Sequence, residues 1–96
     1  MQTVIFVAPL FQPGEVVATP GVLAKVPEIE IALALNRHLQ GDWGDVSTSD
    51  KRSNNRALRN DGQILSVYYT EKNRVKFWII TEADRSSTTV LLPDEY

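Results

Sequence analysis

The last third of the chain carries the most regular pattern of apolar positions. Two runs rich in β-branched and aromatic residues, 64–70 and 75–82, are separated by a short polar stretch, and a third run follows at 88–92. Short runs of this composition between polar turns predict strands. The pattern therefore indicates a three-stranded antiparallel meander at the C-terminal end.

The turn between the first two runs sets their register. If Lys72 and Asn73 form a two-residue turn, with Asn73 tolerating a positive φ, Tyr68 lies opposite Phe77. The next pair points the other way, so both faces of the hairpin carry apolar side chains. Strands of this kind are covered on both sides, here by the N-terminal third or by another subunit.

Prolines and helical spacing organise the first forty residues. Brief strands are expected at 4–7 and 15–18, in a region punctuated by prolines. The pair Thr19–Pro20 begins a short helix, and Pro27 opens a longer one over 28–40. The apolar residues with helical spacing in the longer helix are Ile29, Ala32, Leu33, Leu35 and Leu39.

A further helix is expected to run to about Asn60. Its cap is either Ser47, which has the spacing of a capping box with Asp50, or Ser49. It is nearly all polar, and only Ala57 and Leu58 are available to pack it against the protein. Most of this helix should therefore be solvated.

The order of these elements predicts an α+β fold, with short N-terminal strands and two to three helices followed by the meander. A chain of 96 residues with 43% hydrophobic and 23% charged residues has ordinary globular composition and fits one domain over 1–96. Residues 1–14 could add an N-terminal edge strand. This size excludes a two-domain enzyme, and no cofactor is expected.

The cysteine count and the N-terminal sequence bear on location. With no cysteine, the chain cannot form a disulfide framework, a thiolate metal site or a cysteine nucleophile. Its apolar start lacks a basic region and is broken by Pro9, so it fits neither a signal peptide nor a membrane span. These features favour a cytoplasmic protein with no membrane partner.

Charge is unevenly distributed along the chain. The 10 basic and 12 acidic residues give a net charge of -2, which excludes a globally basic nucleic-acid binder. Residues 36–59 nevertheless hold five bases against three acids. The bases of the polar helix could contact phosphates, although a solvated helix face is the commoner explanation. These bases are Lys51, Arg52, Arg56 and Arg59.

His38, the only histidine, falls near the C-terminal end of the 28–40 helix. The helix dipole favours the imidazolium there, which would suit acid–base chemistry near neutral pH. The alternative is a helix-end residue that bonds to the following loop. The residue type alone does not decide between the two.

A loop with two carboxylates around a tryptophan follows this helix. Asp42 and Asp45 flank Trp43, and their spacing does not match a calcium loop, so no metal site is expected. Two interpretations stay open. Trp43 is either the buried anchor of a rigid turn or, with Asp42, part of a binding surface.

The polar stretch 81–89 lies at a strand end, where binding and catalytic groups are frequent. Glu82 as base, Arg85 as anion clamp and His38 as acid are the parts of a metal-free ribonuclease. This set is assembled from residue types and not from a motif. The alternative is a turn in which Asp84 and Arg85 form an exposed ion pair.

Three stretches carry a resemblance to a known family: VATPG at 17–21, RHLQGDWG at 37–44 and WIITEADRSSTTVLLPDEY at 78–96. They resemble a family of small bacterial proteins from plasmids, phages and integrative elements, often labelled plasmid-related protein. The family has no established activity, so the resemblance implies no catalytic residues. It implies a bacterial cytoplasm and service to a mobile genetic element.

Two hypotheses of different classes follow. The first is a small protein-binding or inhibitor module acting on a host or element-encoded complex, with Trp43, Asp42 and the helix arginines as its surface. The second is a metal-independent ribonuclease or other phosphate-ester enzyme, which requires His38, Glu82 and Arg85 to meet in one cleft. A nucleic-acid partner for the basic helix and a homo-oligomer are further options. The helix arginines are Arg52, Arg56 and Arg59.

Overall fold

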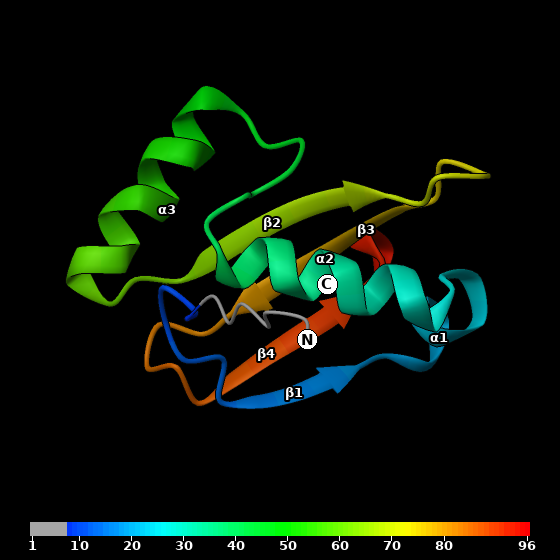
Figure 1. Ribbon diagram of the computed structural model, residues 1–96, viewed down its shortest axis with the longest axis horizontal. Coiled ribbons are helices and arrows are strands. Elements are labelled where there is room, and N and C mark those ends of the chain that lie inside the picture. The colour runs from blue at the N-terminus through cyan, green and yellow to red at the C-terminus, as the bar shows by residue number, and fades with distance from the viewer. Residues whose placement is uncertain (1–7) are drawn as a thin grey trace, which may run out of the picture.

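The computed structural model describes residues 8–96 and has the α+β architecture that the sequence predicts (Figure 1). The strand expected at 4–7 and the first half of the expected edge strand 1–14 lie outside the described residues. None of the helices in the described part is long and apolar enough to cross a membrane. In chain order the elements are β1 (Glu15–Ala18), α1 (Pro20–Lys25), α2 (Glu28–Leu39), α3 (Thr48–Asn60), β2 (Ile64–Tyr69), β3 (Lys76–Thr81), β4 (Ser87–Leu91) and the 3-10 helix η1 (Pro93–Glu95).

The three C-terminal strands form the predicted meander. β2 pairs antiparallel with β3, and Tyr68 lies opposite Phe77 as expected. β4 pairs antiparallel with β3 on the other side. The positive φ of the hairpin falls on Arg74 (53°) and not on Asn73, because the hydrogen-bonded strand ends enclose a longer loop than two residues.

The short strand β1 extends this meander to a mixed sheet, which the sequence did not predict. The strand order is β1-β4-β3-β2, and β1 runs parallel to β4. Parallel strands need a long connection, and here all three α-helices and two strands lie between β1 and β4 in the chain. A four-residue strand carries too little local pattern to identify so distant a partner.

Two of the helices begin with the expected side-chain caps. At the start of α1, Thr19 Oγ1 accepts a hydrogen bond from the Val22 N–H (3.2 Å). At the start of α3, Ser47 Oγ accepts one from the Asp50 N–H (3.0 Å). Each cap satisfies an amide that the helix itself leaves unbonded. Helix α3 ends at Asp61, which adopts the left-handed conformation.

Helix α2 lies across one face of the sheet, and the main core forms beneath α1 and α2 (Figure 1). The N-terminal third thus covers the face that carries Tyr68 and Phe77. On the opposite face, the ring of Tyr96 packs against Trp78, with 5.9 Å between centroids. The buried members of the main core are Val22, Val26, Ala34, Tyr68, Phe77, Ile79, Val90 and Leu92.

Helix α2 carries aliphatic side chains on its exposed side as well as on its buried side. Ala34 and His38 are buried against the sheet, whereas Ile29 and Leu33 are 66% and 56% exposed. Aliphatic residues occupy both sides of this helix, so their spacing predicts a helix without identifying its inner face. The side that packs against the sheet carries Ile31, Ala34, Leu35 and His38.

Candidate functional site

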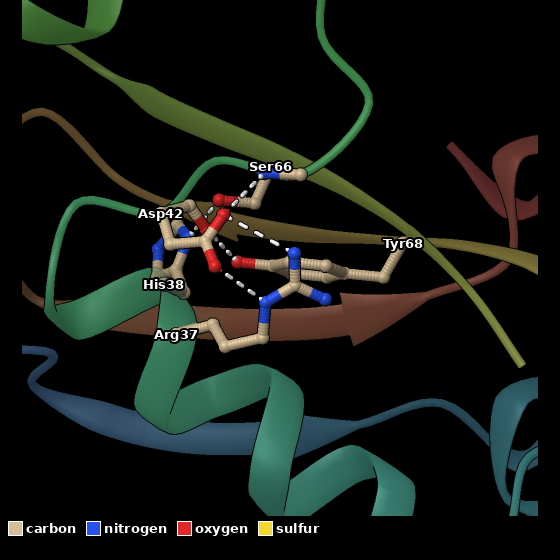
Figure 2. Close-up of polar contacts among 6 residues, drawn as sticks. Arg37, His38, Asp42, Ser66 and Tyr68 are labelled. Atoms are coloured by element: carbon tan, nitrogen blue, oxygen red, sulfur yellow. Dashed lines mark hydrogen bonds and ion pairs between the residues drawn. The ribbon is translucent and has the colours of Figure 1, made fainter. Parts of the chain in front are cut away.

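His38 lies in a buried chain of hydrogen bonds. It has no exposed surface. Its Nδ1 lies 2.6 Å from Ser66 Oγ on β2 (Figure 2), and its Nε2 lies 2.8 Å from Thr81 Oγ1 on β3. Thr81 in turn lies 2.7 Å from Thr88 Oγ1 on β4, and Thr88 donates to the carbonyl of Pro13 (2.7 Å). The chain joins α2 to three strands and to the segment before β1.

The carbonyl of Pro13 fixes the direction of the hydrogen bonds from Thr88 back to His38 Nε2. The carbonyl of Pro13 can only accept, so Thr88 uses its hydroxyl hydrogen there and must accept from Thr81. Thr81 therefore accepts from the Nε2–H of His38, and in the neutral imidazole Nδ1 accepts from Ser66. The network thus places a proton on Nε2.

Electrostatics favour the neutral imidazole. Burial, followed by the positive charge of Arg85, lowers the pKa of His38 to about 4 from its ordinary value of 6.5. Burial thus outweighs the helix dipole, which would favour the imidazolium. At neutral pH His38 is uncharged, and both ring nitrogens are occupied by hydroxyl groups. It acts here as a structural connector.

Arg37 and Asp42 form an ion pair at the C-terminal end of α2 (Figure 2). The Arg37 Nε lies 2.7 Å from Asp42 Oδ2, and Nη2 lies 3.2 Å from Oδ1. The hydrogen bond from Arg37 lowers the pKa of Asp42. Tyr68 donates its hydroxyl to the Asp42 carbonyl (2.6 Å), and the Arg37 guanidinium lies over the Tyr68 ring. Asp42 therefore fixes the loop to β2.

Arg85 is a clamp on the C-terminal end of α3. Its Nη1 donates to the carbonyl of Gly62 (2.6 Å) and its Nη2 to that of Ala57 (2.8 Å). A further Nη1 bond reaches the carbonyl of Glu82 (3.1 Å). A positive charge at this end complements the helix dipole and bonds carbonyls near the helix end.

The three residues of the enzyme hypothesis are not arranged around one cleft. His38 has no exposed surface, and the guanidinium of Arg85 is engaged with α3. The ring of Phe11 contacts both, at 5.3 Å from the His38 ring and 5.5 Å from the Arg85 guanidinium carbon. Glu82 is exposed at the end of β3. This geometry offers no support for acid–base chemistry by the three residues.

Trp43 is the buried anchor of its loop. It is 3% exposed, and its Nε1–H donates to Asn55 Oδ1 on α3 (3.2 Å). Its ring packs against Phe11 and His38 in a second core cluster that also contains Ala57. The tryptophan is therefore not available on the surface, where the binding interpretation needs it.

The sheet edge formed by β2 is bonded to other parts of the chain at Leu65 and Val67. Asn54 of α3 acts like a neighbouring strand: it accepts from the Leu65 N–H (3.1 Å) and donates to the Leu65 carbonyl (2.7 Å). At Val67, the N–H donates to the Trp43 carbonyl (3.0 Å), and the carbonyl accepts from the Asp45 N–H (2.8 Å). Asn54 is thus used by the fold and is not free for phosphates.

The opposite edge, formed by β1, is open in the described part of the chain. The N–H groups of Glu15 and Thr19 donate toward β4. Because successive residues of a strand alternate in direction, the backbone groups of Val16 and Ala18 point away from the sheet. No residue among 8–96 forms a backbone hydrogen bond with these outward groups.

An apolar groove adjoins this open edge, between β1, α1 and α2. Leu23 and Ile29 are 54% and 66% exposed there. Sequence reasoning missed the groove, although the aliphatic residues on two sides of the 28–39 helix were a signal that one side faces outward. The groove is lined by Ala18, Leu23, Glu28, Ile29, Ile31, Ala32 and Leu35.

The basic residues of α3 are all on the surface. Within residues 8–96, none of them forms an ion pair with an acidic side chain. Asn55, on the same helix, accepts a hydrogen bond from Trp43. The exposed bases are Lys51, Arg52, Arg56 and Arg59.

Fold and surface together define a small α+β domain with a mixed four-stranded sheet, a buried histidine and two exposed regions of contrasting chemistry. The described residues contain no cluster of histidine and carboxylate side chains that could hold a metal ion. In comparisons with known proteins, no family model, curated protein or solved structure matches this chain.

Proposed function

We propose that this chain is a protein-binding module that takes up an extended segment of its partner along the open edge of β1. The contrast between the two sheet edges carries the proposal. The outward backbone groups of Leu65 and Val67 are bonded, whereas those of Val16 and Ala18 have no backbone partner among residues 8–96. An unpaired edge is a template for an added strand. The resemblance to proteins of plasmids and phages favours a host or element-encoded partner.

An added strand would also reach the apolar groove. Ala18 aligns with Val90 of the core, so Val16 and Ala18 face the α2 side of the sheet. A strand about 4.8 Å beyond β1 therefore directs every second side chain toward Leu23 and Ile29. Covering these two exposed side chains contributes on the order of 1 kcal/mol each.

The charges around the groove define the chemistry of the partner. Glu28 lines the groove, and Glu15 begins β1. Glu95 lies at the start of α1, where it accepts a hydrogen bond from Thr19 (2.6 Å). Lys25 offsets one of these three negative charges. The segment that fits has apolar residues alternating with lysine or arginine.

Selection from a displayed library of random peptides against the full chain tests this function. Enriched peptides should alternate apolar and basic residues. Val16→Pro removes an N–H that β4 does not use, so the fold should persist while peptide affinity falls at least tenfold, by roughly 1.4 kcal/mol. Ile29→Gln should weaken binding similarly by removing an apolar contact in the groove.

The matched control is Leu33→Gln, on the same helix and similarly exposed but outside the groove. It should leave the affinity within twofold. Selection of acidic peptides, or binding that neither Val16→Pro nor Ile29→Gln weakens, would overturn the proposal. So would sedimentation showing a dimer that Val16→Pro dissociates, because β1 would then pair with a second copy of the chain.

A further inference from the structure

The outward face of α3 is a row of arginines. At 100° per residue, Arg52, Arg56 and Arg59 lie within about 60° of one another around the helix axis. The buried residues Asn54 and Ala57 mark the opposite side. All three arginines are exposed, so the row faces solvent along its whole length.

The positive charges of this row repel one another and so destabilise the helix that carries them. Residues 51–60 contain four bases and no acid. Arg52 and Arg56 are four residues apart and Arg56 and Arg59 three apart, and each such like-charge pair is destabilising by about 0.2–0.5 kcal/mol. No described acidic side chain forms an ion pair that offsets the repulsion. The helix dipole favours Arg59, which lies in the last turn, but it does not account for Arg52 and Arg56.

The helix is held rigidly from its inner side. Asn54 bonds the backbone of β2, Trp43 bonds Asn55, and Arg85 bonds carbonyls at the C-terminal end of α3. These tethers leave the arginine row unobstructed. Helix α3 stands at one end of the molecule, apart from α1 and α2 (Figure 1).

The side chains beside the arginines indicate which class of macromolecule this face can bind. Protein interfaces need apolar anchors at their centre, and single-stranded nucleic acid needs aromatic side chains for base stacking. This face has neither, since Trp43 is buried in the second core cluster. A polar, positively charged face is typical of duplex DNA interfaces. The exposed residues between 51 and 60 are Lys51, Arg52, Ser53, Asn55, Arg56, Arg59 and Asn60.

We propose that α3 binds the phosphate backbone of duplex DNA through this arginine row. An α-helix with its side chains is about 10–12 Å across, and the B-form major groove is about 12 Å wide. The row spans roughly 10 Å along the helix axis, so arginines at both ends can reach phosphates bordering the groove. The major groove of duplex RNA is too narrow for the same approach.

Fluorescence anisotropy with a labelled duplex DNA of arbitrary sequence tests the proposal on the full chain. Binding should be micromolar at low salt and weaken with a log–log salt slope of about −2.7, since each neutralised phosphate contributes about −0.9. The triple variant Arg52→Gln/Arg56→Gln/Arg59→Gln should lose at least tenfold in affinity and most of the slope. Its melting temperature should be unchanged or higher, because like-charge repulsion is removed.

The matched control removes three positive charges elsewhere, as Lys25→Gln/Lys72→Gln/Lys76→Gln, and should keep the affinity within threefold. An equal loss in the control would show that net charge alone is responsible and would overturn the proposal. The absence of binding at low salt would also overturn it. Tighter binding of single-stranded DNA, duplex RNA or a polyglutamate peptide would reject duplex DNA as the partner.

Discussion

His38 connects α2 to the sheet through a hydroxyl group on each of its ring nitrogens. Thr81 accepts the Nε2 proton, and in the neutral imidazole Ser66 donates to Nδ1. Protonation of Nδ1 would require the Ser66 hydroxyl to turn from donor to acceptor. It would also place a charge where no solvent reaches, near Arg85. The residue therefore links folding stability to pH.

The unfolding free energy should fall as the pH drops from 7 to 5. The pKa of His38 is about 4 in the folded chain, below its ordinary value of 6.5, so the unfolded chain takes up the proton first. The contribution is complete above about pH 6.5 and is lost toward pH 4, which amounts to about 2 kcal/mol between pH 7 and 5. Urea unfolding followed by tryptophan fluorescence measures it.

The control for this prediction is His38→Gln, which keeps a donor and an acceptor but does not titrate. It should be less stable than the native chain at pH 7, yet its unfolding free energy should change little between pH 7 and 5. Equal pH slopes for the two proteins would exclude His38 as their source.

At the scale of elements, α3 shows how a helix with little apolar surface is retained. Ala57 is its buried apolar residue, and polar bonds from Asn54 and Arg85 supply the other attachments. Sequence reasoning predicted the span and the solvated face of this helix correctly. It could not predict the attachments, because Arg85 is distant in the chain and adopts a positive φ of 62° that arginine rarely takes.

Replacing Arg85 should destabilise the fold mainly through α3. Arg85→Gly relieves a positive φ, worth up to about 1 kcal/mol, but loses charged hydrogen bonds to carbonyls at the end of the helix. We expect a net loss of about 2 kcal/mol, or roughly 10 °C in melting temperature. Thermal unfolding followed by circular dichroism measures the change.

Arg74→Gly is the matched control, because Arg74 has a similar φ of 53° and lies over the Tyr69 ring without clamping a helix. Relief of the positive φ and loss of the ring contact should nearly cancel, within about 1 kcal/mol. Equal melting temperatures for the two variants would show that the Arg85 clamp does not stabilise the fold.

At the scale of the whole molecule, the two edges of the sheet differ in chemistry. Within residues 8–96, the β1 edge is open, apolar and bordered by acids such as Glu28. The β2 edge is bonded at Leu65 and Val67 and adjoins the arginine row of α3. The net charge of -2 does not reveal that acidic residues gather near one edge and basic residues near the other. Together, the two proposals describe a small adaptor that holds a protein segment at one edge and duplex DNA at the other.

The two edges should act independently. Three strand spacings, roughly 14 Å, separate β1 from β2, and sites that far apart with no shared partners usually behave additively. Saturating duplex DNA should change the affinity for a selected basic-apolar peptide by less than twofold. Raising salt fourfold should weaken DNA binding by roughly 40-fold and peptide binding far less. Coupling above tenfold would mean that the two surfaces form one site.

The sequence by itself determined the α-helices and strands within residues 15–96, the pairing of Tyr68 with Phe77, and the separation of charge along the chain. These features depend on residues a few positions apart, where periodicity and turn chemistry act directly. Only the tertiary structure decided that β1 pairs with β4, that Trp43 and His38 are buried, and that Ile29 faces outward. Each of these depends on contacts between distant segments, and the local pattern is compatible with several such arrangements.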